Sequence, residues 1–259
     1  MTKIQPEHSL GSCLARLQHR TEMKSNIDYE KKSRLLIGAL DPEVKHWVCK
    51  IDGTYWIHSP LLIMFGLGHH DPAEINETYH KMKALADKYM ANIRYAPLKY
   101  LAVIKKQYRL DAFLEIQNKI SDAQYWRCLE YIWILTERVH QLKYTWLALF
   151  ESPRRNRALM MERKDRKHFE TLPDVLTIYR GYQHGLHKHK MGMSWTLSKE
   201  KAEWFAYRWK ENGKAMVVSG VCRKVDVICY TNGRKEEEII INPSKITKLK
   251  NISVGKSQF

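Results

Sequence analysis

Several signals that would assign the chain to a membrane or secreted class are missing from its sequence. The longest apolar run, residues 61–67, is far shorter than the roughly 20 residues that a membrane-spanning helix needs. The first seven residues also lack the apolar core of a signal peptide. We therefore expect a cytoplasmic protein with no membrane partner.

Cysteine is scarce, and the histidines are poorly arranged for a metal. The cysteines are Cys13, Cys49, Cys128, Cys222 and Cys229. Because their number is odd and no two form a C-x-x-C pair, they argue against a disulfide framework and against a zinc site. His184, His187 and His189 lie close together, but Lys188 and Lys190 would repel a cation there. The sequence predicts reduced structural thiols and no metal.

The usual motifs of nucleotide-binding and hydrolytic enzymes are also absent. The chain contains no G-x-G-x-x-G, P-loop, G-x-S-x-G or H-E-x-x-H sequence. These absences remove the ordinary sequence evidence for a Rossmann or P-loop fold, a serine hydrolase or a zinc protease.

Acidic side chains are too few to balance the basic ones. The chain has 44 lysines and arginines against 28 acidic residues, which gives a net charge of +16. Such a field attracts polyanions, and nucleic acid is the commonest of these. One basic stretch has little acid between its members: Arg154, Arg155, Arg157, Arg163, Lys164, Arg166 and Lys167. It is either a solvated helix face or part of a nucleic-acid contact.

Residues 1–120 are expected to form a mainly helical region with one hairpin at 44–58. Asp52-Gly53 is a strong turn signal between candidate strands at 44–51 and 54–58, because both turn residues tolerate a positive φ. Asp71 is expected to cap a helix that begins at Pro72. Apolar side chains then recur at three- and four-residue steps as far as Ile93, which is typical of an amphipathic helix.

Residues 121–259 are expected to form a second domain. Ser121 and Gln124 have capping-box spacing, and an apolar stripe from Ile132 to Leu149 predicts one long helix that Pro153 ends. From residue 175 the apolar period changes from 3.6 to 2, with a helix capped by Ser198 between the strands. The candidate strands are 175–180, 193–196, 215–222, 225–230, 238–241 and 246–254. The chain is therefore predicted to be α+β, with helices first and a mainly antiparallel sheet after them.

Three polar segments in the strand-rich region attract attention because of their order. They are Arg180-Gly181, Ser194-Trp195-Thr196 and Glu236-Glu237-Glu238. Ser194 and Thr196 alternate along a strand and share a face, and the same argument places Glu236 and Glu238 on one face. Each segment alone has an ordinary explanation, as a surface ion pair, a common strand composition or a solvated turn.

Together, these segments resemble the R-S-E class of mono-ADP-ribosyltransferases over residues 121–259. A glycine follows Arg180, a helix rich in alanine and phenylalanine follows the Ser-x-Thr strand, and Asn242-Pro243 follows the apolar triplet after Glu238. Trp195 stands where many members have threonine. The resemblance implies a fold of two packed, mainly antiparallel sheets, with NAD⁺ bound as co-substrate in the cleft between them and no metal.

The resemblance also implies a role for each residue. Glu238 would hold the nicotinamide ribose and face the oxocarbenium-like cation that forms when the glycosidic bond breaks. Arg180 would bind the NAD⁺ phosphates, Ser194 would orient Glu238, and Glu236 would act on the acceptor. The expected NAD⁺-binding residues are Arg180, Gly181, Ser194, Trp195, Thr196 and Glu238.

Three interpretations of the acceptor stay open. The first is RNA, in the manner of bacterial antiphage toxins of this superfamily; the net charge of +16 favours it, with Arg154, Arg155 and Arg157 binding the acceptor beside Glu236. Such a toxin would need a neutralising antitoxin protein. The second is arginine on a target protein, which family members with the E-x-E pattern usually modify. The third is a non-catalytic RNA-binding module in which the three segments are accidental.

Overall fold

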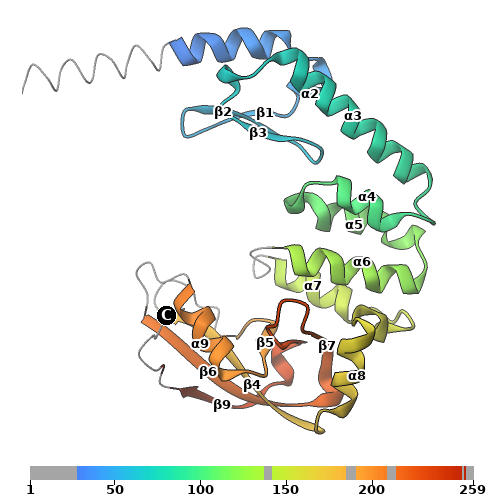
Figure 1. Ribbon diagram of the computed structural model, residues 1–259, viewed down its shortest axis with the longest axis vertical. Coiled ribbons are helices and arrows are strands. Elements are labelled where there is room, and N and C mark those ends of the chain that lie inside the picture. Colours follow the sequence, from blue (N-terminus) through green and yellow to red (C-terminus); the bar gives the residue numbers. More distant parts are fainter. Residues whose placement is uncertain (1–27, 137–141, 185–190, 209–213, 253, 255–259) are drawn as a thin grey trace, which may run out of the picture. The chain divides into compact units, whose positions relative to one another are not determined.

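The computed structural model describes residues 28–136, 142–184, 191–208, 214–252 and 254, drawn in colour in Figure 1. The chain divides into two compact units, residues 1–112 and 113–259. The division falls inside helix α5 (Arg109–Ile116), whereas the sequence suggested a boundary after residue 120. The α+β class is confirmed, because helices and antiparallel sheets make up both units.

The N-terminal unit packs helices on a three-stranded antiparallel sheet in the order β1-β2-β3. Residues 28–39 are helical. The elements that follow are α2 (Pro42–Lys45), β1 (Val48–Ile51), β2 (Thr54–His58), β3 (Ile63–Phe65), a 3-10 turn (Leu67–His69), α3 (Pro72–Ala91), α4 (Pro97–Val103) and a 3-10 turn (Lys106–Tyr108). Val44, Ile57 and Leu67 are fully buried at the centre of its core.

The turn and the helix cap predicted in this unit from the local sequence are confirmed. Asp52 and Gly53 both adopt a positive φ and join β1 to β2 as expected. The carboxylate of Asp71 accepts a hydrogen bond from the Ala73 amide at 2.9 Å, which caps α3. The first strand begins later than expected, at Val48, because Pro42 starts the short helix α2 just before it.

The C-terminal unit begins with helices that cover one end of its sheet. They are α6 (Asp122–Leu135), α7 (Lys143–Phe150), a 3-10 turn (Arg157–Met160) and α8 (Arg163–Thr171). The capping box of Ser121 and Gln124 is confirmed. The single long helix is wrong: α6 ends at Leu135, because the backbone of Thr136 is extended. Trp146 then packs against Trp133 with ring centroids 5.1 Å apart, instead of continuing one stripe.

All six predicted strands form, with ends shifted by a few residues, and they make one antiparallel sheet in the order β7-β8-β5-β4-β6-β9. Their bounds are β4 (Val175–His184), β5 (Ser194–Thr196), β6 (Lys214–Arg223), β7 (Val227–Thr231), β8 (Glu238–Ile241) and β9 (Thr247–Ile252). Helix α9 (Lys199–Arg208) packs on β4. A Cβ atom at Gly181 would lie 2.0 Å from the Ala202 carbonyl oxygen, so only glycine allows this close approach.

In the part of the chain that the structure describes, the strands of this unit form one six-stranded sheet and not two separate ones. The sheet is instead divided within itself, since β4 and β5 share the single residue pair Tyr179–Thr196. By contrast, β4 pairs with β6 along its whole length, and β5 pairs with β8 along all of its residues. Two three-stranded halves, β7-β8-β5 and β4-β6-β9, are thus joined at one point, and Arg180, Ser194 and Glu238 lie beside it.

Candidate active site at the junction of the two half-sheets

Arg180 fills the place where the ladder between β4 and β5 stops. One residue past the Tyr179–Thr196 pair, its Nη1 donates to the backbone carbonyl oxygen of Ser194. A Cβ atom at Gly192 would lie 2.5 Å from the central carbon of the guanidinium, so a larger residue there would displace the Arg180 side chain from its present position. Burial lowers the pKa of Arg180 to about 10, and the charge of Glu238 opposes this shift. The side chain therefore brings a permanent positive charge into the sheet.

Glu238 is a buried carboxylate at this junction. It starts β8 opposite Thr196 and is only 5% exposed. Its Oε1 accepts a hydrogen bond from the indole of Trp133 at 3.3 Å, whereas its Oε2 is buried with no hydrogen-bond donor among the described residues. A buried carboxylate oxygen without a donor is costly, and such groups gather at functional sites.

The charged neighbours of Glu238 act on its ionisation in opposite directions. Burial raises the pKa of Glu238 above its usual value, and the nearby carboxylate of Glu236 raises it further. The Ser194 hydroxyl, the Arg234 charge and the Trp133 indole lower it. The site thus holds an acid away from water, and three of its four named neighbours favour the charged form of that acid.

The loop that precedes β8 is built around Asn232. Its carbonyl oxygen accepts from the Lys235 amide at 2.9 Å, and its side-chain oxygen accepts from the Glu237 amide at 3.2 Å. Lys235 and Glu237 both have a positive φ, which non-glycine residues adopt rarely. Asp165 on α8, 4% exposed, accepts from the Asn232 amide at 2.9 Å. Helix α8 therefore anchors the loop that carries the glutamates.

Glu236 and Glu238 come together, but the alternation argument for it is wrong. Strand β8 begins only at Glu238, and the left-handed backbone of Glu237 interrupts the two-residue period. The two carboxylates meet instead at Arg234, whose Nη2 lies 2.9 Å from Glu236 Oε2 and 3.8 Å from Glu238 Oε2. The junction thus unites Arg180, Ser194, Glu236 and Glu238.

Three of the expected NAD⁺-binding residues are engaged in packing or in hydrogen bonds within the unit. Trp195 is 2% exposed and packs in the main core of the unit, with its indole donating to the Gly192 carbonyl oxygen at 2.8 Å. Thr196 is buried, and its hydroxyl donates to the Glu236 carbonyl oxygen at 2.6 Å. Gly181 lies against α9. These contacts show how the three residues support the shape of the site.

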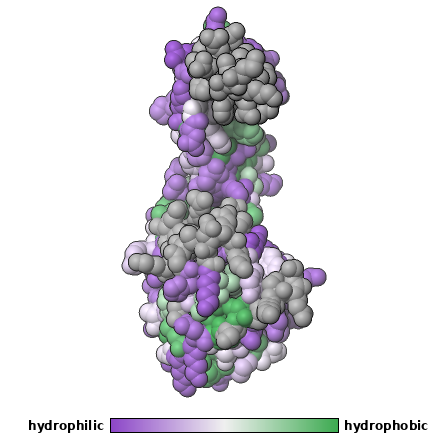
Figure 2. Space-filling model, turned by 90° about the vertical axis from the view of Figure 1, so that its left-hand side faces the viewer, coloured by the Kyte–Doolittle hydropathy of each residue, from purple (hydrophilic) through white to green (hydrophobic). Residues whose placement is uncertain are grey.

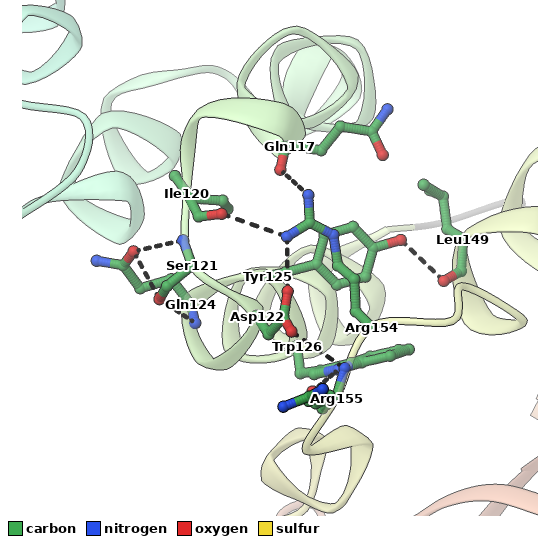
Figure 3. A network of polar contacts seen from close by, with 10 residues as sticks. All are labelled: Gln117, Ile120, Ser121, Asp122, Gln124, Tyr125, Trp126, Leu149, Arg154 and Arg155. Atoms are coloured by element: carbon green, nitrogen blue, oxygen red, sulfur yellow. Dashed lines mark hydrogen bonds and ion pairs between the residues drawn. The ribbon is translucent and has the colours of Figure 1, made fainter.

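Arg154 is a further correction, because its side chain is a structural tie and not part of an acceptor surface (Figure 3). Its guanidinium donates to the carbonyl oxygens of Gln117 at 2.7 Å and Ile120 at 3.3 Å, and to the carboxylate of Asp122 at 3.0 Å. It also lies over the ring of Tyr125, 4.7 Å from the centroid. These contacts occupy the N–H groups of Arg154 that would otherwise be available to bind a phosphate.

The side chains of Arg155 and Arg157, in contrast, are exposed. The backbone of Arg155 is held by Asp122 and Trp126, but neither contact uses its guanidinium. These two arginines stay candidates for contact with an acceptor.

Two residues of the site carried no usable sequence signal as site residues. Trp133 lies 105 positions before Glu238, on a helix whose apolar stripe indicates only core packing. Asp165 lies in the basic stretch of α8, where the sequence indicates only a single acidic residue on a solvated helix face. Arg234 had a weak signal, since an arginine two residues before Glu236 can pair with it once the chain turns at Asn232-Gly233.

Other features of the described residues do not compete with this junction. No group of three or more metal-ligating side chains comes together in them, and no helix among them is long and apolar enough to cross a bilayer. His187, His189, Lys188, Lys190 and Cys13 lie outside the described residues. The four cysteines that the structure describes, Cys49, Cys128, Cys222 and Cys229, are free thiols.

A separate hollow of about 470 Å³ lies at the ends of β6 and β9. It is lined by Tyr207, Lys214, Ala215, Met216, Asn251, Ile252 and Val254, none of which is a predicted site residue. Figure 2 shows hydrophobic surface in the lower part of its view, within this unit. Strand β6 stands three places from β8 in the sheet, so this hollow is distinct from the glutamates.

No protein-family model matches this chain, and no curated protein or solved structure is significantly similar to it. The functional argument therefore depends on the site itself.

Proposed function

We propose that this chain is an ADP-ribosyltransferase that uses NAD⁺ as co-substrate. The observation that carries the proposal is the buried carboxylate of Glu238, whose Oε2 has no donor among the described residues while Glu236 and Arg234 lie beside it. Cleavage of the nicotinamide–ribose bond leaves a cation on the ribose, and a carboxylate removed from water stabilises such a cation strongly. The order of the motifs in the sequence supports the same chemistry.

The proposal gives each residue a role, which its position supports. Glu238 faces the cation and holds the ribose 2′-hydroxyl with the oxygen that lacks a donor. Arg180 brings a desolvated positive charge to the same junction, where it favours the anionic phosphates of NAD⁺ and fixes the backbone of Ser194. Glu236, 16% exposed in its side chain, stands closer to solvent than Glu238 and takes the proton from the acceptor.

RNA is the acceptor that the charge of the chain favours. The net charge of +16 attracts phosphates, and exposed cations continue from Arg155 and Arg157 onto α8 with Arg163, Lys164 and Lys167. In this proposal the protein is a cytoplasmic toxin that modifies RNA, and a neutralising antitoxin protein accompanies it.

A protein arginine is the second candidate acceptor, and one observation favours it. The guanidinium of Arg234 already lies 2.9 Å from Glu236, so the site accommodates that chemical group beside its acceptor-facing acid. A planar guanidinium suits a carboxylate better than any other cationic side chain does.

The test uses NAD⁺ labelled in its adenine ring, incubated with the full chain and a cell lysate. Nicotinamide release is measured first, and the labelled product is then divided between nuclease and protease digestion. Loss of the label with nuclease supports RNA, and loss with protease supports a protein. Glu238→Gln serves as the inactive control, with an expected loss of roughly a thousandfold in rate. RNA binding without any nicotinamide release would mean that the chain is a non-catalytic RNA-binding module.

A further inference from the structure

The loop between β7 and β8 holds Arg234 against Glu236 of the loop and Glu238 at the start of β8. The distances from Arg234 Nη2 are 2.9 Å to Glu236 Oε2 and 3.8 Å to Glu238 Oε2. The side chain of Arg234 is 52% exposed, whereas those of Glu236 and Glu238 are 16% and 7% exposed. The guanidinium therefore approaches the buried carboxylates from the solvent side, from which a macromolecular acceptor must also arrive.

Stability gives only a weak reason for this contact. An ion pair with a half-exposed cation contributes little to folding, because water screens it and the long side chain loses conformational freedom. The side chain is nevertheless held in place, since Nη1 donates to the Ile134 carbonyl oxygen at 3.2 Å. That contact directs Nη2 toward the two carboxylates, which is the position that an attacking nitrogen needs.

We propose that Arg234 is itself an acceptor, and that this chain attaches ADP-ribose to it within the same molecule. The inference rests on the proposed function, because it requires that Glu238 cleaves NAD⁺. It adds a modification site in the loop that carries Glu236.

The chemistry balances without any further reactant. The bond between C1′ of the ribose and the nicotinamide nitrogen breaks, and nicotinamide leaves as a neutral molecule with the electron pair. Nη2 of Arg234 forms a new bond to C1′, and the proton that this nitrogen loses passes to Glu236. The products are nicotinamide, a proton and an ADP-ribosylated arginine that keeps its positive charge.

The modification would also restrain the enzyme. An ADP-ribose group on Arg234 places two phosphates and two riboses beside Glu236, in the space through which another acceptor must enter. Transfer to an external acceptor should therefore slow as Arg234 becomes modified.

The experiment incubates the purified full chain with adenine-labelled NAD⁺ and no other acceptor. Nicotinamide release is measured in each sample, and the labelled peptides are mapped by mass spectrometry. The label should lie on Arg234, and its rate of attachment per molecule should not change over about a hundredfold dilution, because the reaction is intramolecular.

Two variants make the test specific. Arg234→Lys keeps a positive charge but removes the guanidinium, and the label per nicotinamide released should fall roughly tenfold or more. Arg223→Lys is the matched control: Arg223 is also an exposed, ion-paired arginine, 69% exposed beside Asp226. Its label per nicotinamide released should equal that of the wild type.

The outcomes separate this inference from the function beneath it. Nicotinamide release with no label on Arg234, or a labelling rate that rises with protein concentration, overturns self-modification and leaves the transferase proposal standing. A chain that releases no nicotinamide overturns both.

Discussion

The indole Nε1 of Trp133 lies 3.3 Å from Oε1 of Glu238, and this contact ties a helix outside the sheet to a buried carboxylate of the site. The hydrogen bond favours the charged form of Glu238 and so lowers a pKa that burial raises. Trp133 is therefore a positioning residue that also adjusts the ionisation of the acid.

Replacing Trp133 by phenylalanine should move the pH profile of NAD⁺ cleavage. Without the indole donor the pKa of Glu238 rises further, so a higher pH is needed to ionise it. The acidic limb of nicotinamide release against pH should therefore shift upward. The control is Trp146→Phe, because the buried indole nitrogen of Trp146 has no hydrogen-bond partner among the described residues. Equal profiles for both variants would limit Trp133 to packing.

Changing Glu236 to glutamine should separate the two halves of the reaction. Glu238 keeps its charge and still cleaves NAD⁺ to water, whereas the acceptor loses the group that takes its proton. Transfer to the macromolecular acceptor should fall roughly a hundredfold or more, and nicotinamide release in the absence of acceptor should fall much less. Equal losses in both assays would assign Glu236 to the support of the loop alone.

Glu130 on α6 predicts a pH-dependent stability. Burial, together with the charges of Glu162 and Asp165, raises the pKa of Glu130 to about 7. A carboxyl with a raised pKa in the folded state binds protons more tightly there, so the fold loses stability as the pH rises from about 4.5 to about 7. Glu130→Gln removes this loss, and should gain roughly 2–3 kcal/mol at pH 8 but little at pH 4.

Denaturant unfolding at the two pH values checks this prediction. Glu170→Gln, an exposed acid on α8, serves as the control and should gain nothing at either pH. A gain for Glu130→Gln that is the same at pH 4 and pH 8 would show that the side chain acts through packing and not through its charge.

Local physics made most of the fold predictable. Caps such as Asp71 and the turn at Asp52-Gly53 depend on neighbouring atoms, and the period-2 pattern located every strand of the larger sheet. The break of the central helix at Thr136 was missed, because the apolar period continues past it. Whether a helix ends there depends on the tertiary packing of its two parts, which the local sequence does not specify.

The candidate site divides in the same way. The order of Arg180, Ser194 and Glu238 in the sequence indicated that they meet, and the structure brings them to one junction. The contact between Trp133 and Glu238 is set by how α6 packs on the sheet, so no spacing reveals it. Likewise, composition counts Arg154 as one more positive charge, whereas the structure commits it to two carbonyl oxygens and a carboxylate.

That commitment makes Arg154 a stability residue. Arg154→Ala leaves the Gln117 and Ile120 carbonyl oxygens and the Asp122 carboxylate without their donor, and it removes the contact with Tyr125. The free energy of unfolding should fall by roughly 2–3 kcal/mol, as expected for the loss of a charge-assisted network that is mostly shielded from water. Arg155→Ala should cost less than about 0.5 kcal/mol, because its exposed side chain holds nothing in place.

The exposed positions Arg155 and Arg157 decide whether the basic surface binds RNA. If the exposed side chains of Arg155 and Arg157 pair with phosphates, binding to single-stranded RNA should weaken with salt, and each lost contact should flatten the log–log slope by about 0.7. In the double variant with alanine at both positions, the slope should therefore become shallower by about 1.4. Transfer of ADP-ribose to RNA should also decrease. Nicotinamide release without acceptor should continue, because neither arginine has a role in the proposed cleavage of NAD⁺. Affinity is measured by titration at several salt concentrations, with Arg223→Ala as an exposed control that removes one positive charge where the double variant removes two. An identical slope for the wild type and the double variant would remove these arginines from the RNA surface, and a protein arginine would then be the favoured acceptor.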